Sequence, residues 1–297
     1  MATITRVGTM QAQSFVLEQI NKSTAKYVDV QEQISTGQKT QRYDGMADFA
    51  AMTVNLSNGE ATINQYLKTS DIADSRLTAT HSALSNVLDV MTKFRAKLIQ
   101  GMTAEQADEG RLDSLADGYL EEIEAALNTD LGGVYLFAGT KNDAPPVDLS
   151  DPINNAAGDY YSGAGELMQA RLDENTVMEY GVTADRQGFK DLIVALQRVS
   201  SASGSLSELE TALDEVNSAV DDLTQLEAEI GHQMDVVVRA KTRNDAIKAT
   251  MVTQLSSLRD VDVSAAMVEL TQRQTILQAS YLVISRSSDL TLTNYLR

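Results

Sequence analysis

The stretch GVYLFAGTKNDAPPV, residues 133–147, differs from the rest of the chain. It begins apolar and aromatic, turns polar, and ends in a proline pair. All three prolines of the 297 residues, Pro145, Pro146 and Pro152, lie within eight residues. Proline interrupts helices because it lacks a backbone N–H and clashes with the preceding turn. We therefore expect this stretch to mark the place where a helical chain reverses, in a small β-rich insert.

Heptad-spaced apolar residues predict a long helix before this stretch. One column of the heptad grid, interrupted by Ser70, is Leu56, Ile63, Leu77, Leu84, Met91 and Leu98. The neighbouring column holds Leu67 and Leu88, with Asp74, His81 and Arg95 as exceptions. A helix over 56–98 would be about 65 Å long at the usual rise per residue. The capping-box spacing of Thr103 and Gln106 predicts a further helix to about residue 128.

A second long helix is predicted after the insert. It starts at the capping box of Ser205 and Glu208. Its apolar stripe, with Glu227 as a gap, is Leu206, Leu209, Leu213, Val216, Val220, Leu223, Ile230, Met234 and Val237. After polar Lys241, Asn244 and Lys248 the stripe recovers at Met251, Leu255 and Leu258. Neither helix can bury its stripe alone, so we expect the two to pair in an elongated antiparallel bundle, mainly α in class.

Between the long helices, residues 131–189 predict short strands separated by turns. The candidates are 134–137, 159–161, 167–172 and 177–182. The Gly163-Ala-Gly165 segment lacks the lysine and the helix signal of a phosphate-binding loop, so we interpret it as a turn.

The two ends of the chain carry weaker heptad stripes. The N-terminal stripe is Met10, Leu17, Ile20, Tyr27 and Ile34. The C-terminal stripe is Met267, Leu270, Leu277, Tyr281 and Ile284. Polar residues interrupt both, which predicts terminal helices that pair with each other marginally and order fully on assembly. Simple coiled-coil ends of a rod are the alternative.

Charge divides the chain in the same way. Residues 1–44 carry five Lys/Arg and four Asp/Glu and residues 259–297 carry four of each, so residues 45–258 carry a net charge of −19 within the total of −18. This contrast indicates that the ends and the middle face different surroundings. We predict terminal assembly helices at 1–44 and 259–297, a long-helix rod at 45–130 and 190–258, and a β-rich outer insert at 131–189.

Composition excludes several classes of function. The absence of cysteine rules out disulfides and thiol chemistry, and the acidic balance argues against nucleic-acid or anionic-membrane partners. No apolar run reaches the length of a membrane span, and the N-terminus lacks the pattern of a secretory signal.

Residues for catalysis, metal binding or a cofactor are not apparent. The two histidines, His81 and His232, lie far apart, and we interpret them as a polar interruption of a stripe and a solvated side chain. Carboxylate pairs such as Glu121-Glu122 occupy adjacent helix positions, which do not share a face. We expect no catalytic site, no metal and no cofactor, and hence no enzyme.

Three motifs resemble the flagellin superfamily. Near the N-terminus the segment QISTGQKT places Ser35, Thr36, Gly37 and Lys39 ahead of acidic Asp44 and Asp48. The central stretch supplies Tyr135, Phe137, Gly139, Pro145 and Pro146. The last thirty residues, which end in LTLTNYLR, are also similar to that superfamily and resemble its hook–filament junction members more than its filament members. The sequence departs from the family pattern where an Asp-Asp pair is spread over Asp44 and Asp48.

The resemblance implies an extracellular protein of the bacterial flagellum, exported through the flagellar type III channel. Its terminal helices would form the inner tube by self-assembly with other axial proteins, through the two terminal stripes and Leu290, Leu292 and Leu296. An export chaperone is a possible further partner. A hook–filament junction protein is the function we favour, a filament-forming flagellin is the alternative, and a soluble scaffold or type III needle-tip-like protein is more remote.

Overall fold

The computed structural model describes residues 2–40, 49–103, 109–150, 159–201 and 205–292. Contacts between backbone positions divide the chain into two compact units, residues 1–60 with 249–297 and residues 61–248. The helices are α1 (Ala2–Thr36), α2 (Ala50–Thr103), α3 (Glu109–Leu127), α5 (Gln187–Ser201), α6 (Leu206–Arg259) and α7 (Val263–Leu292). The strands are β1 (Met168–Arg171) and β2 (Val177–Tyr180). The mainly α fold with a small β insert is confirmed, while the predicted three-part division stays a prediction.

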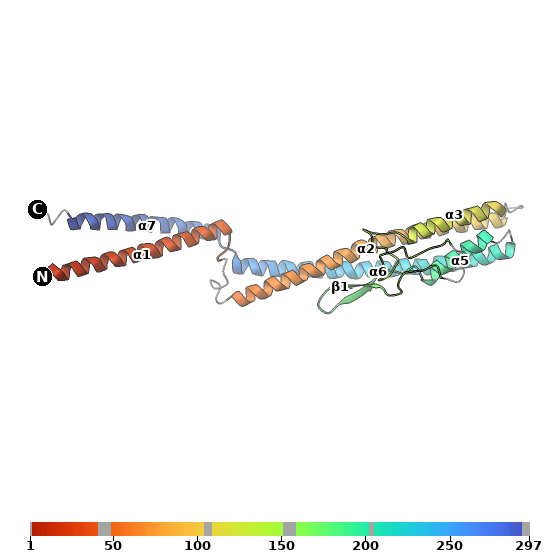
Figure 1. Ribbon diagram of the computed structural model, residues 1–297, viewed down its shortest axis with the longest axis horizontal. Coiled ribbons are helices and arrows are strands. Elements are labelled where there is room, and N and C mark those ends of the chain that lie inside the picture. The colour runs from red at the N-terminus through yellow and green to blue at the C-terminus, as the bar shows by residue number, and fades with distance from the viewer. Residues whose placement is uncertain (1, 41–48, 104–108, 151–158, 202–204, 293–297) are drawn as a thin grey trace. The chain divides into compact units, whose positions relative to one another are not determined.

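The first unit contains the pair of terminal helices. Figure 1 shows α1 and α7 side by side and running in opposite directions, and the two helices pack against each other. Within the same unit α2 and α6 approach closely at Gly59, where an added Cβ atom would lie 3.0 Å from the Met251 methyl group.

The core of the second unit is a seam between α2 and α6. Buried residues alternate three and four steps apart on both helices, as in coiled coils. On α2 they are Ser70, Ala73, Leu77, Thr80, Leu84, Val87, Met91, Phe94 and Leu98. On α6 they are Leu209, Ala212, Val216, Ala219, Leu223, Leu226, Ile230, Gln233, Val237, Ala240 and Asn244. The two helices are antiparallel, because Lys241 pairs with Asp71 near one end of the seam and Arg95 contacts Asn217 near the other.

One column of the predicted seam was correct and the other was wrong by one residue. The column of Leu77, Leu84 and Leu98 is buried, but Leu88 and Leu213 are only half-buried, because Val87 and Ala212 occupy the seam instead. Heptad reasoning selected the large residues, whereas the helices pack through the smaller ones beside them.

Two polar residues of the predicted second column, Asp74 and His81, are half-buried beside the seam, as Leu88 and Leu213 are. An Asp74 carboxylate oxygen lies 3.9 Å from the Lys241 ammonium nitrogen, and the His81 Nδ1 atom lies 3.6 Å from a Glu227 carboxylate oxygen. These residues therefore do not interrupt the seam. They make contacts across its solvent-facing edge.

Helices α3 and α5 pack against each other over the seam, and Figure 1 shows α3 beside α2 and α5 beside α6. Helix α5 is amphipathic and buries one face, formed by Phe189, Leu192, Ile193, Leu196 and Val199. An ion pair between Arg198 and Glu215 holds it to α6 at 2.7 Å.

The insert contains less strand than the sequence predicts. The segments around residues 167–172 and 177–182 form the antiparallel hairpin β1–β2, with Met168 opposite Tyr180. The segments at 134–137 and 159–161 make only isolated bridges, between Asp130 and Tyr135 and between Val147 and Tyr161. Each of these is too short to extend a ladder, and single backbone hydrogen bonds between loops, such as that from the Asp148 amide to the Tyr160 carbonyl oxygen at 3.1 Å, hold this part of the insert together.

Candidate assembly site

The site that the sequence proposes is the pair of terminal helices, and the structure gives it a contact stripe. On α1 the buried and half-buried positions recur every three or four residues, at Val16, Ile20, Ser23, Tyr27, Val30 and Ile34. On α7 they are Ala266, Leu270, Arg273, Leu277, Ser280 and Ile284. Only Ile20, Ser23, Val30 and Ala266 among these positions are buried, whereas every seam position of the second unit named above is buried, so the stripe buries less of its apolar surface.

The predicted terminal residues separate into two groups. Six of them lie on the contact stripe, namely Ile20, Tyr27, Ile34, Leu270, Leu277 and Ile284. Leu17, Met267 and Tyr281 lie one position off it and are 54%, 57% and 56% exposed. The α1–α7 contact therefore does not use these three side chains.

Four predicted residues at the chain ends have no described side-chain environment. Met10 belongs to α1, and Leu290 and Leu292 belong to α7, but their side chains lie outside the described set, and Leu296 lies outside the described residues altogether.

Further large apolar residues are exposed on the same two helices, and sequence reasoning missed them. They are Phe15, Val28, Val268, Ile276, Leu282 and Val283. Heptad spacing could not find them, because they fall on several faces rather than in one column. Exposed apolar residues on several faces of both helices leave surface that another molecule could cover.

The motif after α1 ends that helix. Gly37 has a φ of 71°, and its amide donates to the Gln33 carbonyl oxygen at 2.8 Å. A left-handed glycine at this position is a common way to stop a helix. The Thr36 hydroxyl donates to the Glu32 carbonyl oxygen and accepts from the Gln38 amide, so two more groups at the helix end are paired.

Lys39 of the same motif reaches another helix. Its ammonium group donates to the carbonyl oxygens of Ser257, at 2.7 Å, and Leu258, at 3.4 Å, in the last turn of α6. A cation at this place satisfies free carbonyl groups and interacts favourably with the helix dipole. Of the motif residues, Lys39 and Gly37 thus form a joint between α1 and the end of α6, Thr36 pairs groups at the end of α1, and Ser35 is exposed. Asp44 and Asp48, predicted with them, lie outside the described residues.

The central motif is a tightly packed turn. Gly139 has a φ of 63°, and an added Cβ atom would lie 2.2 Å from the Ala164 carbonyl oxygen, so only glycine fits here. Phe137 is fully buried and meets Phe189 of α5 edge-to-face, with ring centroids 5.9 Å apart. Phe137 therefore positions the insert on α5, and Gly139 allows a close backbone approach within the insert.

The remaining central residues also pack within the insert. Tyr135 is half-buried, Pro146 is buried and Pro145 is exposed. The Ser162 hydroxyl donates to the Pro145 carbonyl oxygen at 3.0 Å, and the Ser162 amide donates to that of Pro146 at 2.8 Å. Nearby, burial raises the pKa of Tyr160, whose hydroxyl donates to the Ala184 carbonyl oxygen.

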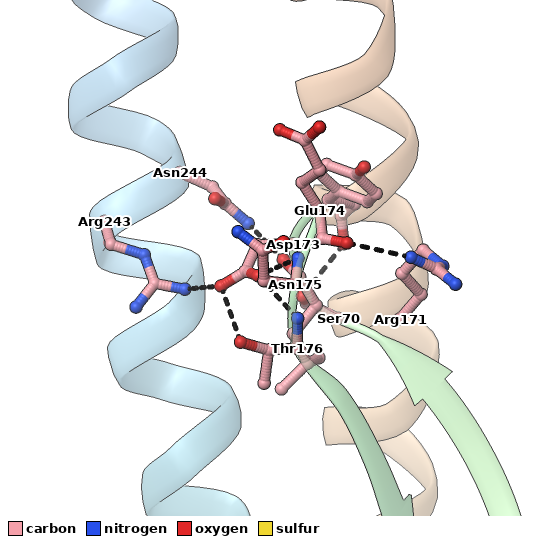
Figure 2. Close-up of polar contacts among 10 residues, drawn as sticks. Ser70, Arg171, Asp173, Glu174, Asn175, Thr176, Arg243 and Asn244 are labelled. Carbon is pink, nitrogen blue, oxygen red and sulfur yellow. Dashed lines mark hydrogen bonds and ion pairs between the residues drawn. The ribbon is translucent and has the colours of Figure 1, made fainter.

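Figure 2 shows the turn of the hairpin held against α6. One Asp173 carboxylate oxygen accepts from the amides of Asn175 and Thr176, at 2.8 and 2.7 Å, and the other pairs with Arg243. Burial alone would raise the pKa of Asp173, but these donors outweigh it and hold the pKa below its usual value. The Asn244 side chain donates to the Leu172 carbonyl oxygen at 2.8 Å.

The base of the hairpin is fixed to both long helices. Arg76 of α2 donates to the Tyr180 hydroxyl at 3.2 Å, and the Gly181 amide donates to the Gln233 side chain of α6 at 2.9 Å. Together with the contacts of the turn, these bonds hold the hairpin at both ends.

Within the described residues there is no group of three or more His, Cys, Asp or Glu side chains that could hold a metal ion. The helices described are all too short or too polar to cross a membrane.

Comparison with known families gives two matches on this chain. Residues 7–142 match the bacterial flagellin N-terminal helical region, and residues 213–296 match the bacterial flagellin C-terminal helical region. Together they cover most of the chain.

Individual relatives agree with these matches. The chain is 25% identical to flagellar hook-associated protein 3 of Escherichia coli (strain K12), across 92% of this chain and 94% of that protein. It is 24% identical to the protein of the same name from Salmonella typhimurium, across 93% of this chain and 95% of that protein.

Among solved structures, FlgL of Bacillus cereus shares the fold with a TM-score of 0.57 at 20% identity, over 68% of this chain and 99% of that one. Flagellar hook-associated protein 3 of Legionella pneumophila aligns with a TM-score of 0.58 at 13% identity, over 68% of this chain and 98% of that one.

Proposed function

This chain belongs to the bacterial flagellin family, and we propose that it is a structural subunit of the flagellum that joins the hook to the filament. The observation that carries the proposal is the exposure of large apolar side chains along both α1 and α7. The names of the two relatives that match nearly the whole chain support the junction role within the family.

The proposed mechanism is burial of these side chains between neighbouring subunits. Leu17, Met267 and Tyr281 are free of the α1–α7 contact, so they can pack against other molecules without opening it. Burying one side chain of this size contributes about 1.5–3 kcal/mol. Several such contacts per subunit would offset the entropy that subunits lose on assembly.

We assign the same role to the predicted residues of the chain ends, Met10, Leu290, Leu292 and Leu296. The six residues on the contact stripe would act indirectly, since they hold α1 and α7 together and so fix the positions of the exposed side chains.

The partners we propose are further copies of this chain and the axial proteins on either side of the junction, hook-associated proteins and flagellin. Such a subunit would work outside the cell, after export through the flagellar type III channel, with an export chaperone as a further candidate partner. Its role would be structural, with no catalytic residue.

A filament-forming flagellin is the alternative, because the family matches include that class. A deletion of the gene separates the two roles. Loss of a junction protein should leave cells with hooks but without filaments, and with flagellin released into the medium. If this chain were the filament flagellin, the deletion would leave no flagellin to release. Return of the intact gene should restore filaments in either case, which controls for effects on neighbouring genes.

A further inference from the structure

The break between α6 and α7 is not caused by a glycine or a proline. Only Asp260, Val261 and Asp262 separate the two helices. Residues 250–270 contain neither glycine nor proline, the residues that ordinarily stop a helix. The sequence would allow one helix to run through the joint, so the break must be held by contacts.

Part of the break is held locally. The Asp262 carboxylate accepts from the amides of Ser264 and Ala265, at 2.9 and 3.1 Å, which is the geometry of a helix N-cap. An Asp side chain caps a helix start but does not by itself forbid helix before it, so this contact favours the break without enforcing it.

The rest is held by the segment after α1. In a continuous helix the carbonyl oxygens of Ser257, Leu258 and Arg259 would accept from the amides four residues later. Here the Lys39 ammonium group donates to the carbonyl oxygens of Ser257 and Leu258. The Lys39 amide donates to the carbonyl oxygen of Arg259 at 2.7 Å. The Val261 amide, which would otherwise bind Ser257, donates instead to the Gly37 carbonyl oxygen at 3.0 Å.

Residues 37–39 therefore take up three carbonyl oxygens and one amide that a continuous helix would pair within itself at the joint. We propose that this segment is a latch: while it is docked, α6 and α7 are separate helices, and when it leaves, residues 260–262 become helical and join them. The terminal helix pair would thereby have two states, set by the end of α1. The inference depends on the joint alone and stands whether or not the chain acts at the hook–filament junction.

Hydrogen exchange with residue resolution on the purified full chain tests the latch. The key variants are Lys39→Met, which removes the charge and keeps the stem, and the double variant Lys39→Met with Asp262→Ala, which also removes the cap. The Lys39 amide should exchange faster by about tenfold, as expected for loss of one hydrogen bond. The amides of Asp262 and Val263, which occupy the cap and first position of α7 and lack a helical acceptor there, should exchange more slowly because they gain one.

The latch predicts faster exchange at the Lys39 amide and slower exchange at the Asp262 and Val263 amides, and this difference decides the test. If the Asp262 and Val263 amides exchange faster together with that of Lys39, the joint has only loosened and the proposal is wrong. No change at any of these amides would show that Lys39 does not hold the joint. Lys26→Met removes an exposed lysine within α1, away from the joint segment in sequence, and should change none of them. Lys39→Arg, which keeps the cation, should exchange like the wild type.

Discussion

The Asn244 side chain, fully buried in the seam between the long helices, donates to the Leu172 carbonyl oxygen of the hairpin at 2.8 Å. A polar residue in the core of the rod thus holds the tip of the insert. Arg243, the adjacent residue, pairs with Asp173 in the same turn. The hairpin is therefore fixed to α6 by side chains from two successive positions.

We expect Asn244→Ala to destabilise the second unit by about 1–3 kcal/mol, because it leaves a buried carbonyl group without a donor. Urea unfolding measures the change. Asn64→Ala is the matched control, since Asn64 is an exposed residue of α2 and the gain in helix propensity is the same. Equal stability of the two variants would show that the Asn244 contact contributes nothing.

We expect Gly139→Ala to unfold the insert or lower its stability by more than about 1–3 kcal/mol, because both the backbone conformation and the nearby Ala164 carbonyl group exclude a side chain. Gly118→Ala is the comparison. An added Cβ atom there meets open space on α3, so this variant should gain about 0.4–1 kcal/mol. A thermal melt of both proteins checks the signs, and a stable Gly139→Ala protein would refute the assigned role.

The contact of Asp173 should make the hairpin sensitive to acid. Its folded pKa lies below that of a free carboxyl, so its contribution is complete above about pH 4 and is lost as the pH falls through the folded value. Asp173→Asn should therefore show a weaker loss of stability between neutral and acid pH than the wild type, in urea midpoints measured at each pH. Glu174→Gln, which changes the next residue, should keep the wild-type slope. If it flattened the slope equally, the effect would not belong to Asp173.

The exposed stripe should matter for assembly and not for the monomer. Tyr281→Asp should leave the melting temperature of the monomer unchanged and block incorporation into flagella, because the ring is free of the α1–α7 contact. Leu277→Asp, on the contact stripe, should lower the melting temperature as well. Incorporation is read by immunoblot of sheared flagella. Normal incorporation of the Tyr281→Asp protein would exclude this side chain from the interface.

Much of the helical architecture could be predicted from the sequence, because the apolar spacing is long and regular. The predicted helices at 56–98 and after Ser205 lie within α2 and α6. The one-residue error in the second column of every stripe has a single cause. Adjacent columns both lie within the apolar arc of a helix, so heptad spacing alone does not decide between Val87 and Leu88 or between Ala212 and Leu213.

The joint and the hairpin contacts could not be predicted, because they connect residues far apart in the chain. Lys39 and Ser257 are separated by 218 positions, and no local pattern signals that a lysine after α1 will occupy the end of α6. The family resemblance drew attention to Lys39, and only the structure gave it a physical role.

The copy number of this chain per flagellum is the most direct test of the junction role, measured by quantitative mass spectrometry of flagella sheared with their hooks attached. A junction protein should be present in a number comparable with a single ring of subunits. Abundance far above every other component would instead make the chain a filament flagellin, and its absence from the preparation would contradict a flagellar role altogether.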